Sequence, residues 1–174
     1  MSITAIEQIL VLGVGNILLS DEGVGIRVIE RIQERYEFPD NVNVLDGGVL
    51  GLSLLGVISE ADHLIVVDAV KNGGEPGALY RLKGDQVPKR ILAKNSLHQV
   101  DFLETLASCQ AFDRIPETVI LGVEPEDIEN LGIEMTPVVQ AKVDSLVEMV
   151  LKELDRLGVR YRSKKLSKNW LLRG

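Results

Sequence analysis

The sequence predicts an α/β fold, a three-layer sandwich in which helices cover both faces of a mostly parallel, twisted sheet of about five strands. Short apolar runs without polar alternation are typical of buried parallel strands, and here they alternate with amphipathic helical segments. Successive strand–helix–strand units imply right-handed crossovers and therefore parallel strand pairs. A chain of 174 residues is long enough to bury one core without disulfides.

The first strand and helix are the clearest of these units. The strand is predicted over Gln8–Gly13, which is apolar on both faces. A helix over Glu22–Arg35 follows, because its apolar residues recur at helical spacing and its charged residues fall on the opposite side. A loop that begins with glycines joins the two, so the helix starts at the carboxyl edge of the predicted sheet.

The remaining elements are predicted by the same criteria. The further strands are Val42–Asp46, Leu64–Val67, Leu79–Lys83 as an alternating edge strand, and Thr118–Val123. The further helices are Leu50–Ile58, His98–Ser108 and a strongly periodic segment that opens with Thr136 as N-cap and Pro137, and ends at Gly158. We predict a single α/β domain over residues 1–158 and a basic C-terminal tail over residues 159–174.

Charge is unevenly distributed along the chain. The sequence has 19 Lys and Arg residues against 26 Asp and Glu residues, a formal charge of −7. Seven of the basic residues follow Asp155 and no acidic residue does, so residues 1–155 carry a formal charge of −14. An acidic body argues against a nucleic-acid partner, whose phosphates require cationic side chains. It is compatible with a metal cation or a basic peptide, although a surface with surplus acid explains the charge equally well.

The composition indicates a cytoplasmic protein that does not enter a membrane. The single cysteine, Cys109, excludes an intrachain disulfide framework and suits a reducing compartment. No apolar run approaches the roughly 18 residues of a membrane helix, and the N-terminal residues lack a targeting pattern. Nothing in the sequence indicates an obligate dimer, so we expect a monomer.

The glycines after the first strand raise the hypothesis of a nucleotide-binding domain. The dinucleotide fingerprint needs a glycine three residues after Gly15, where this chain has Leu18. Asp46, at the end of the second strand, could take the place of the ribose-binding acid. However, Asp21 and Glu22 stand where a pyrophosphate would meet the helix N-terminus, and their charge would repel it.

A metal site is the second hypothesis for the same edge. Glu22 follows the first strand, Asp68 ends the third, and His98 opens a helix. Two carboxylates and an imidazole could ligate Zn²⁺ or Ni²⁺ and leave a position for water or substrate. Glu22 could instead complement the helix dipole, and His98 could be a capping histidine, whereas Asp68 would be costly to bury without a partner. His63 is excluded, because five strand residues separate it from Asp68 by about 16 Å.

Five blocks of sequence are similar to a known family of enzymes. They are Gly13–Arg27, Leu45–Gly48, Asp68, Ser96–Phe102 and Leu121–Pro137. These blocks occur in the family's order and cover most of residues 9–150, and the first is long and specific, whereas the basic tail lies outside the pattern. On these blocks the chain resembles the [NiFe]-hydrogenase maturation endopeptidases.

The resemblance implies an activity, a partner and a site. Such enzymes remove a short C-terminal extension from the hydrogenase large-subunit precursor after nickel insertion, and the cut follows a basic residue just past the last cysteine ligand. By motif position the family's metal ligands fall on Glu22, Asp68 and His98, and its additional cleft acid falls on Asp46. The implied metal is nickel, which the substrate can supply, with another divalent metal such as zinc as the alternative. The family often has proline before this histidine, whereas Leu97 stands here.

The role of Asp46 and the function of the whole chain stay open. Asp46 could act in catalysis by orienting the peptide or handling a proton, or it could simply be a turn residue before Gly47 and Gly48. The chain as a whole could be the endopeptidase, or a non-catalytic module that binds nickel and the large subunit without cutting it. A nucleotide-binding domain is the least favoured alternative.

Overall fold

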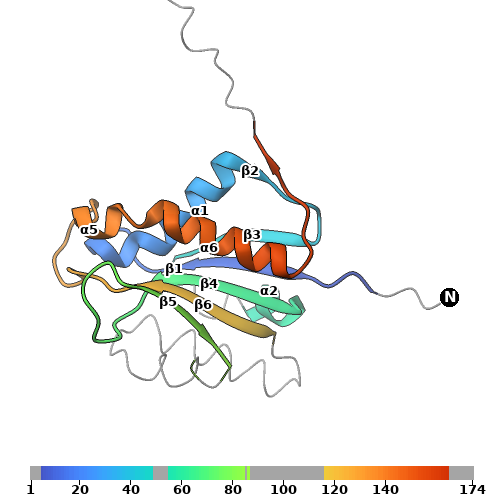
Figure 1. Cartoon of the computed structure of the whole chain (residues 1–174), viewed down its shortest axis with the longest axis horizontal. Coiled ribbons are helices and arrows are strands. Elements are labelled where there is room, and N and C mark those ends of the chain that lie inside the picture. Colours follow the sequence, from blue (N-terminus) through green and yellow to red (C-terminus); the bar gives the residue numbers. More distant parts are fainter. Residues whose placement is uncertain (1–4, 49–54, 85, 87–115, 165–174) are drawn as a thin grey trace, which may run out of the picture.

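The chain forms a five-stranded sheet with helices on both faces, as the sequence predicts (Figure 1). The computed structural model describes residues 5–48, 55–84, 86 and 116–164. The strand order is β3-β1-β4-β6-β5; neighbours run parallel except β5, which is antiparallel to β6. The strands are β1 (Ile9–Val14), β3 (Val42–Gly48), β4 (His63–Ala69), β5 (Leu79–Lys83) and β6 (Glu117–Val123).

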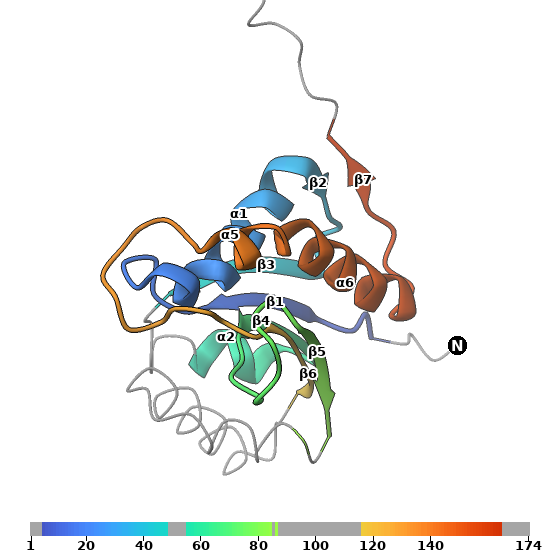
Figure 2. The same ribbon diagram turned by 60° about the vertical axis from the view of Figure 1, so that its left-hand side comes forward.

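Each face of the sheet carries its own apolar layer, because alternate strand residues point to opposite sides. One layer packs the sheet against α1 (Val24–Arg35) and α6 (Val143–Arg156), and the other packs it against α2 (Leu55–Glu60) (Figure 2). In β1, Val11 belongs to the first layer and Leu12 to the second, and both are fully buried. The predicted three-layer arrangement is therefore confirmed.

The connection from β1 to α1 differs slightly from the predicted one. The helix begins at Val24 rather than at the predicted Glu22. Asp21 and Glu22, the two acids before it, lie in a 3-10 turn, η1 (Ser20–Gly23). The strand and helix are in direct backbone contact, since a Cβ on Gly13 would lie 2.5 Å from the carbonyl oxygen of Gly25. These two glycines thus set how closely the start of α1 approaches the sheet.

The last helical segment is interrupted rather than continuous. A short helix, α5 (Pro137–Gln140), is followed by a break before α6. Thr136 is at the predicted N-cap position, but its side chain makes no capping hydrogen bond; its hydroxyl contacts Asp21 instead. Gly158 follows the end of α6 with a φ of +74°, as a helix C-terminus favours.

A second, two-stranded sheet attaches the beginning of the basic tail to the domain. The strand β7 (Arg162–Ser163) pairs antiparallel with β2 (Tyr36–Glu37). Beside them, the ring of Tyr161 contacts the rings of Tyr36 and Phe38, with centroid distances of 5.8 and 5.9 Å. The predicted domain boundary at residue 158 stays a prediction.

Part of the predicted helical structure falls outside the described residues. The helix His98–Ser108 does so entirely, and of the helix Leu50–Ile58 the structure describes the end, α2, which continues to Glu60. Among the described helices, none is long and apolar enough to cross a membrane.

Candidate active site

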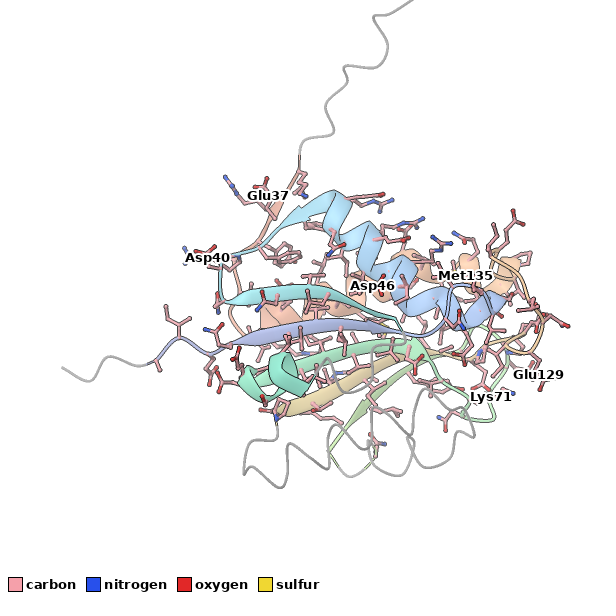
Figure 3. The ribbon with its side chains drawn as sticks, turned by 180° about the vertical axis from the view of Figure 1, so that it is seen from behind. Glu37, Asp40, Asp46, Lys71, Glu129 and Met135 are labelled. Atoms are coloured by element: carbon pink, nitrogen blue, oxygen red, sulfur yellow. The ribbon has the colours of Figure 1, made fainter. Side chains whose placement is uncertain are left out.

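The parallel strands bring acidic side chains to one edge of the sheet. Asp46 lies near the end of β3 and Asp68 near the end of β4. Figure 3 shows Asp46 and Lys71 toward this end of the sheet and Asp40 at the opposite end. Because α/β proteins bind ligands at the carboxyl ends of their parallel strands, this edge is the candidate site.

The turn that carries Glu22 is packed on the same edge, and two glycines allow it. Gly15 has a φ of +136°, and a Cβ there would lie 1.8 Å from the carbonyl oxygen of Glu22. A Cβ on Gly25 would lie 2.3 Å from the carbonyl oxygen of Val67, the residue before Asp68. The turn therefore sits directly on the ends of β1 and β4, which places Glu22 and Asp68 at a common edge.

Both of these acids are buried. The residue exposures are 5% for Glu22 and 8% for Asp68, and each makes interactions within the protein. Because a buried charge is costly unless it is compensated, two buried acids at one edge fit a nearby positive charge. Carboxylate oxygens are suitable ligands for a divalent cation, so the donor chemistry fits the predicted metal.

The third predicted ligand, His98, lies outside the described residues. Within residues 5–48, 55–84, 86 and 116–164, no group of three or more His, Cys, Asp and Glu side chains could hold a metal ion. The three-ligand site therefore stays a prediction. His63 lies at the start of β4, away from this edge, where its ring nitrogens are 3.1 Å from Glu7 and 3.6 Å from Glu117.

Asp46 differs from the two buried acids in being exposed. The strand that carries it continues to Gly48, two residues further than predicted. A Cβ on Gly47 would lie 2.7 Å from the carbonyl oxygen of Gly13, so the end of β3 is held closely against β1. An exposed carboxylate on a fixed strand end can contact a substrate, and its catalytic role stays a prediction.

Asp21 has a structural role that the sequence did not predict. The sequence indicated only a negative charge at the start of the helix. The residue is fully buried, and its carboxylate accepts hydrogen bonds from the backbone amides of Glu126, Asp127 and Thr136 and from the Thr136 hydroxyl. These bonds are 2.8 to 3.0 Å long. Asp21 therefore fixes the acidic loop 124–136 against the turn that carries Glu22.

Glu124 is a further buried acid at this edge that sequence reasoning did not single out. It directly follows β6 and is 7% exposed. Its Oε2 accepts hydrogen bonds from the Asn72 amide at 2.7 Å and from the Tyr80 hydroxyl at 2.8 Å. Glu124 thus ties the segment after Asp68 to β5 and β6. Its position after an apolar strand, like that of Asp68, was the available signal.

The glycine-rich loop offers little to a phosphate. A phosphate site needs free backbone amides at a turn or helix start, but the amides of this turn are used within the protein. The amides of Ser20, Asp21 and Glu22 donate to the carbonyl oxygens of Gly132, Asp127 and Leu19, respectively, at 2.7 to 3.1 Å. In addition, the backbone of Glu22 packs directly against Gly15, where a Cβ would lie 1.8 Å from the Glu22 carbonyl oxygen. These contacts argue against the nucleotide-binding hypothesis.

Comparisons with known proteins find similar sequences and a similar fold. A family model described as hydrogenase maturation protease matches residues 26–153. The hydrogenase 2 maturation protease of Escherichia coli (strain K12) is 42% identical over 154 residues, which cover 87% of this chain and 93% of the relative. The hydrogenase expression/formation protein HupD of Bradyrhizobium diazoefficiens is 43% identical over 155 residues, covering 88% and 81% of the two chains. The solved structure of the hydrogenase maturating endopeptidase HybD from E. coli matches with a TM-score of 0.86 at 39% identity, covering 90% of this chain and 98% of that one.

Proposed function

Because the chain belongs to the hydrogenase maturation protease family, we propose that it is an endopeptidase that removes the C-terminal extension of a [NiFe]-hydrogenase large-subunit precursor after nickel insertion. The observation that carries this proposal is the pair of buried carboxylates, Glu22 and Asp68, at the carboxyl edge of the sheet. The reaction is expected in the cytoplasm, with the enzyme acting as a monomer.

The buried carboxylates, with His98 as a third ligand, would hold a divalent cation. Nickel, carried by the precursor or by the enzyme, is the expected ion, and zinc is the alternative. When bound, such a cation polarises a carbonyl group or lowers the pKa of a water molecule. The chain's own contribution is to fix both carboxylates in advance: the contact of Gly15 with the backbone of Glu22 holds one, and the pairing of β4 with β6 holds the other.

Asp46 would act on the peptide rather than on the metal. Its exposure allows contact with a bound chain, and the close packing of β3 on β1 keeps the strand end in place. A carboxylate in this position can accept a hydrogen bond from a peptide amide or take up a proton during cleavage. We expect Asp46→Asn to slow cleavage without weakening the binding of nickel.

An assay of precursor cleavage distinguishes the two candidate functions, an endopeptidase and a non-catalytic module that binds nickel or the large subunit. Nickel-loaded and nickel-free precursor would each be incubated with the purified protein, and the intact mass of the large subunit would be measured. The proposal predicts a shortened subunit in the nickel-loaded sample alone. Binding without shortening in either sample would favour the module, and a shortened subunit in the nickel-free sample would contradict the role of the metal.

Variants of the ligands test the site itself. Glu22→Gln and Asp68→Asn keep the side-chain shape but remove the charge, and His98→Ala removes the imidazole. We expect each to abolish processing and to weaken the binding of Ni²⁺ in a calorimetric titration. Glu75→Gln, an exposed acid in the loop before β5, is the matched control and should change neither. Full activity in a ligand variant would remove that residue from the site.

A further inference from the structure

Four large apolar side chains are exposed on two neighbouring loops beside the candidate site. Their exposed fractions are 39% for Ile17, 54% for Leu18, 84% for Leu131 and 66% for Ile133. The two loops lie side by side in Figures 1 and 2, where residues 15–20 are blue and residues 124–136 are orange. We refer to these four side chains as the apolar ridge. Exposed apolar residues gathered in this way mark surfaces that bind other molecules.

The apolar ridge is held in place by the backbone beneath it. The Gly132 amide donates to the Leu18 carbonyl oxygen at 2.9 Å, and the Ser20 amide donates to the Gly132 carbonyl oxygen at 2.7 Å. Beneath the ridge, the buried carboxylate of Asp21 binds both ends of the loop segment 126–136. A surface that is already ordered loses little conformational entropy when a partner binds, so the ridge is prepared for a contact.

Exposed acids flank the apolar ridge. Glu126, Glu129 and Glu134 are exposed on the loop that carries Leu131 and Ile133. In the part of the chain that the structure describes, their carboxylates form no ion pair. A partner that covers the ridge would therefore be favoured by Lys or Arg side chains next to its apolar ones.

A groove continues from Ile133 along α1, and it also favours a positively charged partner. Its volume is 450 Å³, and its lining includes Ile133 and Met135, the latter labelled in Figure 3. The arginines of the groove are neutralised by the protein itself: Arg27 pairs with Glu30 at 3.0 Å, and Arg31 pairs with Asp144 at 3.1 Å. Most of the lining is polar and includes the acids Glu34 and Glu134, so the groove adds contact area without adding an unpaired cation that would repel a basic partner.

From the apolar ridge and the groove we infer a docking surface for a polypeptide segment that presents apolar side chains next to Lys or Arg. The identity of this partner rests on the proposed function: the segment belongs to the hydrogenase large-subunit precursor. Its apolar side chains cover Leu131 and Ile133, and its basic side chains face Glu129 and Glu134. Because the loop that carries Leu18 leads directly into the turn η1 that carries Glu22, docking here brings the precursor to the edge where cleavage is proposed.

A double variant, Leu131→Ser with Ile133→Ser, tests the apolar contact. With nickel-loaded precursor as the probe, we expect KM and the dissociation constant to rise about tenfold, the loss typical of removing interface anchors, and the effect to fall on KM rather than on kcat. Leu18→Ser on the other loop should act in the same direction, which guards against misfolding of the first variant. Ile6→Ser is the matched control, since Ile6 is 73% exposed but lies in the N-terminal segment, and it should leave both constants unchanged.

Charge reversal tests the acidic flank. Glu129→Lys combined with Glu134→Lys should weaken binding of the precursor at low ionic strength, and the difference from the wild-type protein should shrink at high salt. An equal difference at both salt concentrations, or tighter binding, would contradict the charge complementarity.

The outcomes of these experiments distinguish a failure of the docking hypothesis from a failure of the proposed endopeptidase reaction. If the wild-type protein cuts the precursor and the serine variants keep its KM and dissociation constant, the docking surface is overturned and the endopeptidase stands. If the wild-type protein binds the precursor without cutting it and the variants lose binding, the docking surface stands and the endopeptidase is wrong. If the wild-type protein does not bind the precursor, the docking surface for this partner is overturned.

Discussion

Replacing Asp21 by Asn is expected to destabilise the protein and to loosen the loop 124–136. The carboxylate is fully buried, and one of its oxygens, Oδ2, accepts hydrogen bonds from the amides of Glu126 and Asp127, both at 2.9 Å. The other oxygen accepts the Thr136 amide at 2.8 Å. An asparagine can replace one oxygen but puts an NH₂ group in place of the other, so at least one set of amides would face a donor.

The magnitude follows from the number of hydrogen bonds lost. If Asn keeps the bond to Thr136, two charge-assisted bonds disappear, each worth about 1.5–3 kcal/mol. Partial rearrangement of the loop reduces the sum, and we expect the free energy of unfolding to fall by about 3 kcal/mol. For a domain of this size, the corresponding fall in Tm is about 6–12 °C.

Urea denaturation and amide hydrogen exchange measure the two parts of this prediction. The amides of Glu126 and Asp127 should exchange faster in Asp21→Asn than in the wild-type protein. Asp40→Asn is the control, since Asp40 is exposed at the opposite end of the sheet (Figure 3) and should change stability by less than about 0.5 kcal/mol. An Asp21→Asn variant with wild-type stability and wild-type exchange at these amides would refute the role assigned to Asp21.

Two further predictions concern packing and pH. Gly25→Ala should lose about 3 kcal/mol of unfolding free energy, because its Cβ would lie 2.3 and 2.5 Å from the carbonyl oxygens of Val67 and Val14; Gly56→Ala, with nothing within 4 Å of its Cβ, should gain about 0.5–1 kcal/mol. Equal stability of the two variants in urea would contradict the close approach of α1. Hydrogen bonding from Arg31 lowers the pKa of Asp144 from its ordinary value of 3.8, so this contribution is present above pH 3.8 and lost as the pH falls through the lowered pKa. Since the Asp144 side chain is 64% exposed, Asp144→Asn should cost less than about 1 kcal/mol near neutral pH, and a cost that did not shrink as the pH fell below 3.8 would contradict this assignment.

The fold could be predicted from sequence because its signals are local. The strands around Val11 and Ile65 are apolar on both faces, which is the pattern of a buried parallel strand, and the structure places them in adjacent positions of the sheet. The edge strand Leu79–Lys83 was equally readable, because its alternation matches its observed burial. The break between α5 and α6 was not predicted, since the apolar periodicity continues across it.

The candidate site could be predicted only in part, because its contacts join segments far apart in the chain. The common edge of Glu22 and Asp68 follows from parallel strands, so sequence pattern was sufficient for it. The role of Asp21 depends on a contact with Thr136, which is 115 residues away. No local sequence pattern predicts such a contact. Glu124 directly follows an apolar strand, which was a local signal, but its partner Tyr80 is 44 residues away on another strand, so its contacts could not be predicted.

The central claim is that the acids at the carboxyl edge of the sheet support cleavage of the precursor. The most direct measurement is the intact mass of the nickel-loaded large-subunit precursor after incubation with the wild-type protein and, in parallel, with Glu22→Gln. We predict a shortened subunit with the wild-type protein and the full-length precursor with Glu22→Gln. A full-length precursor in both samples would contradict the endopeptidase, and a shortened subunit in both would contradict the role of Glu22.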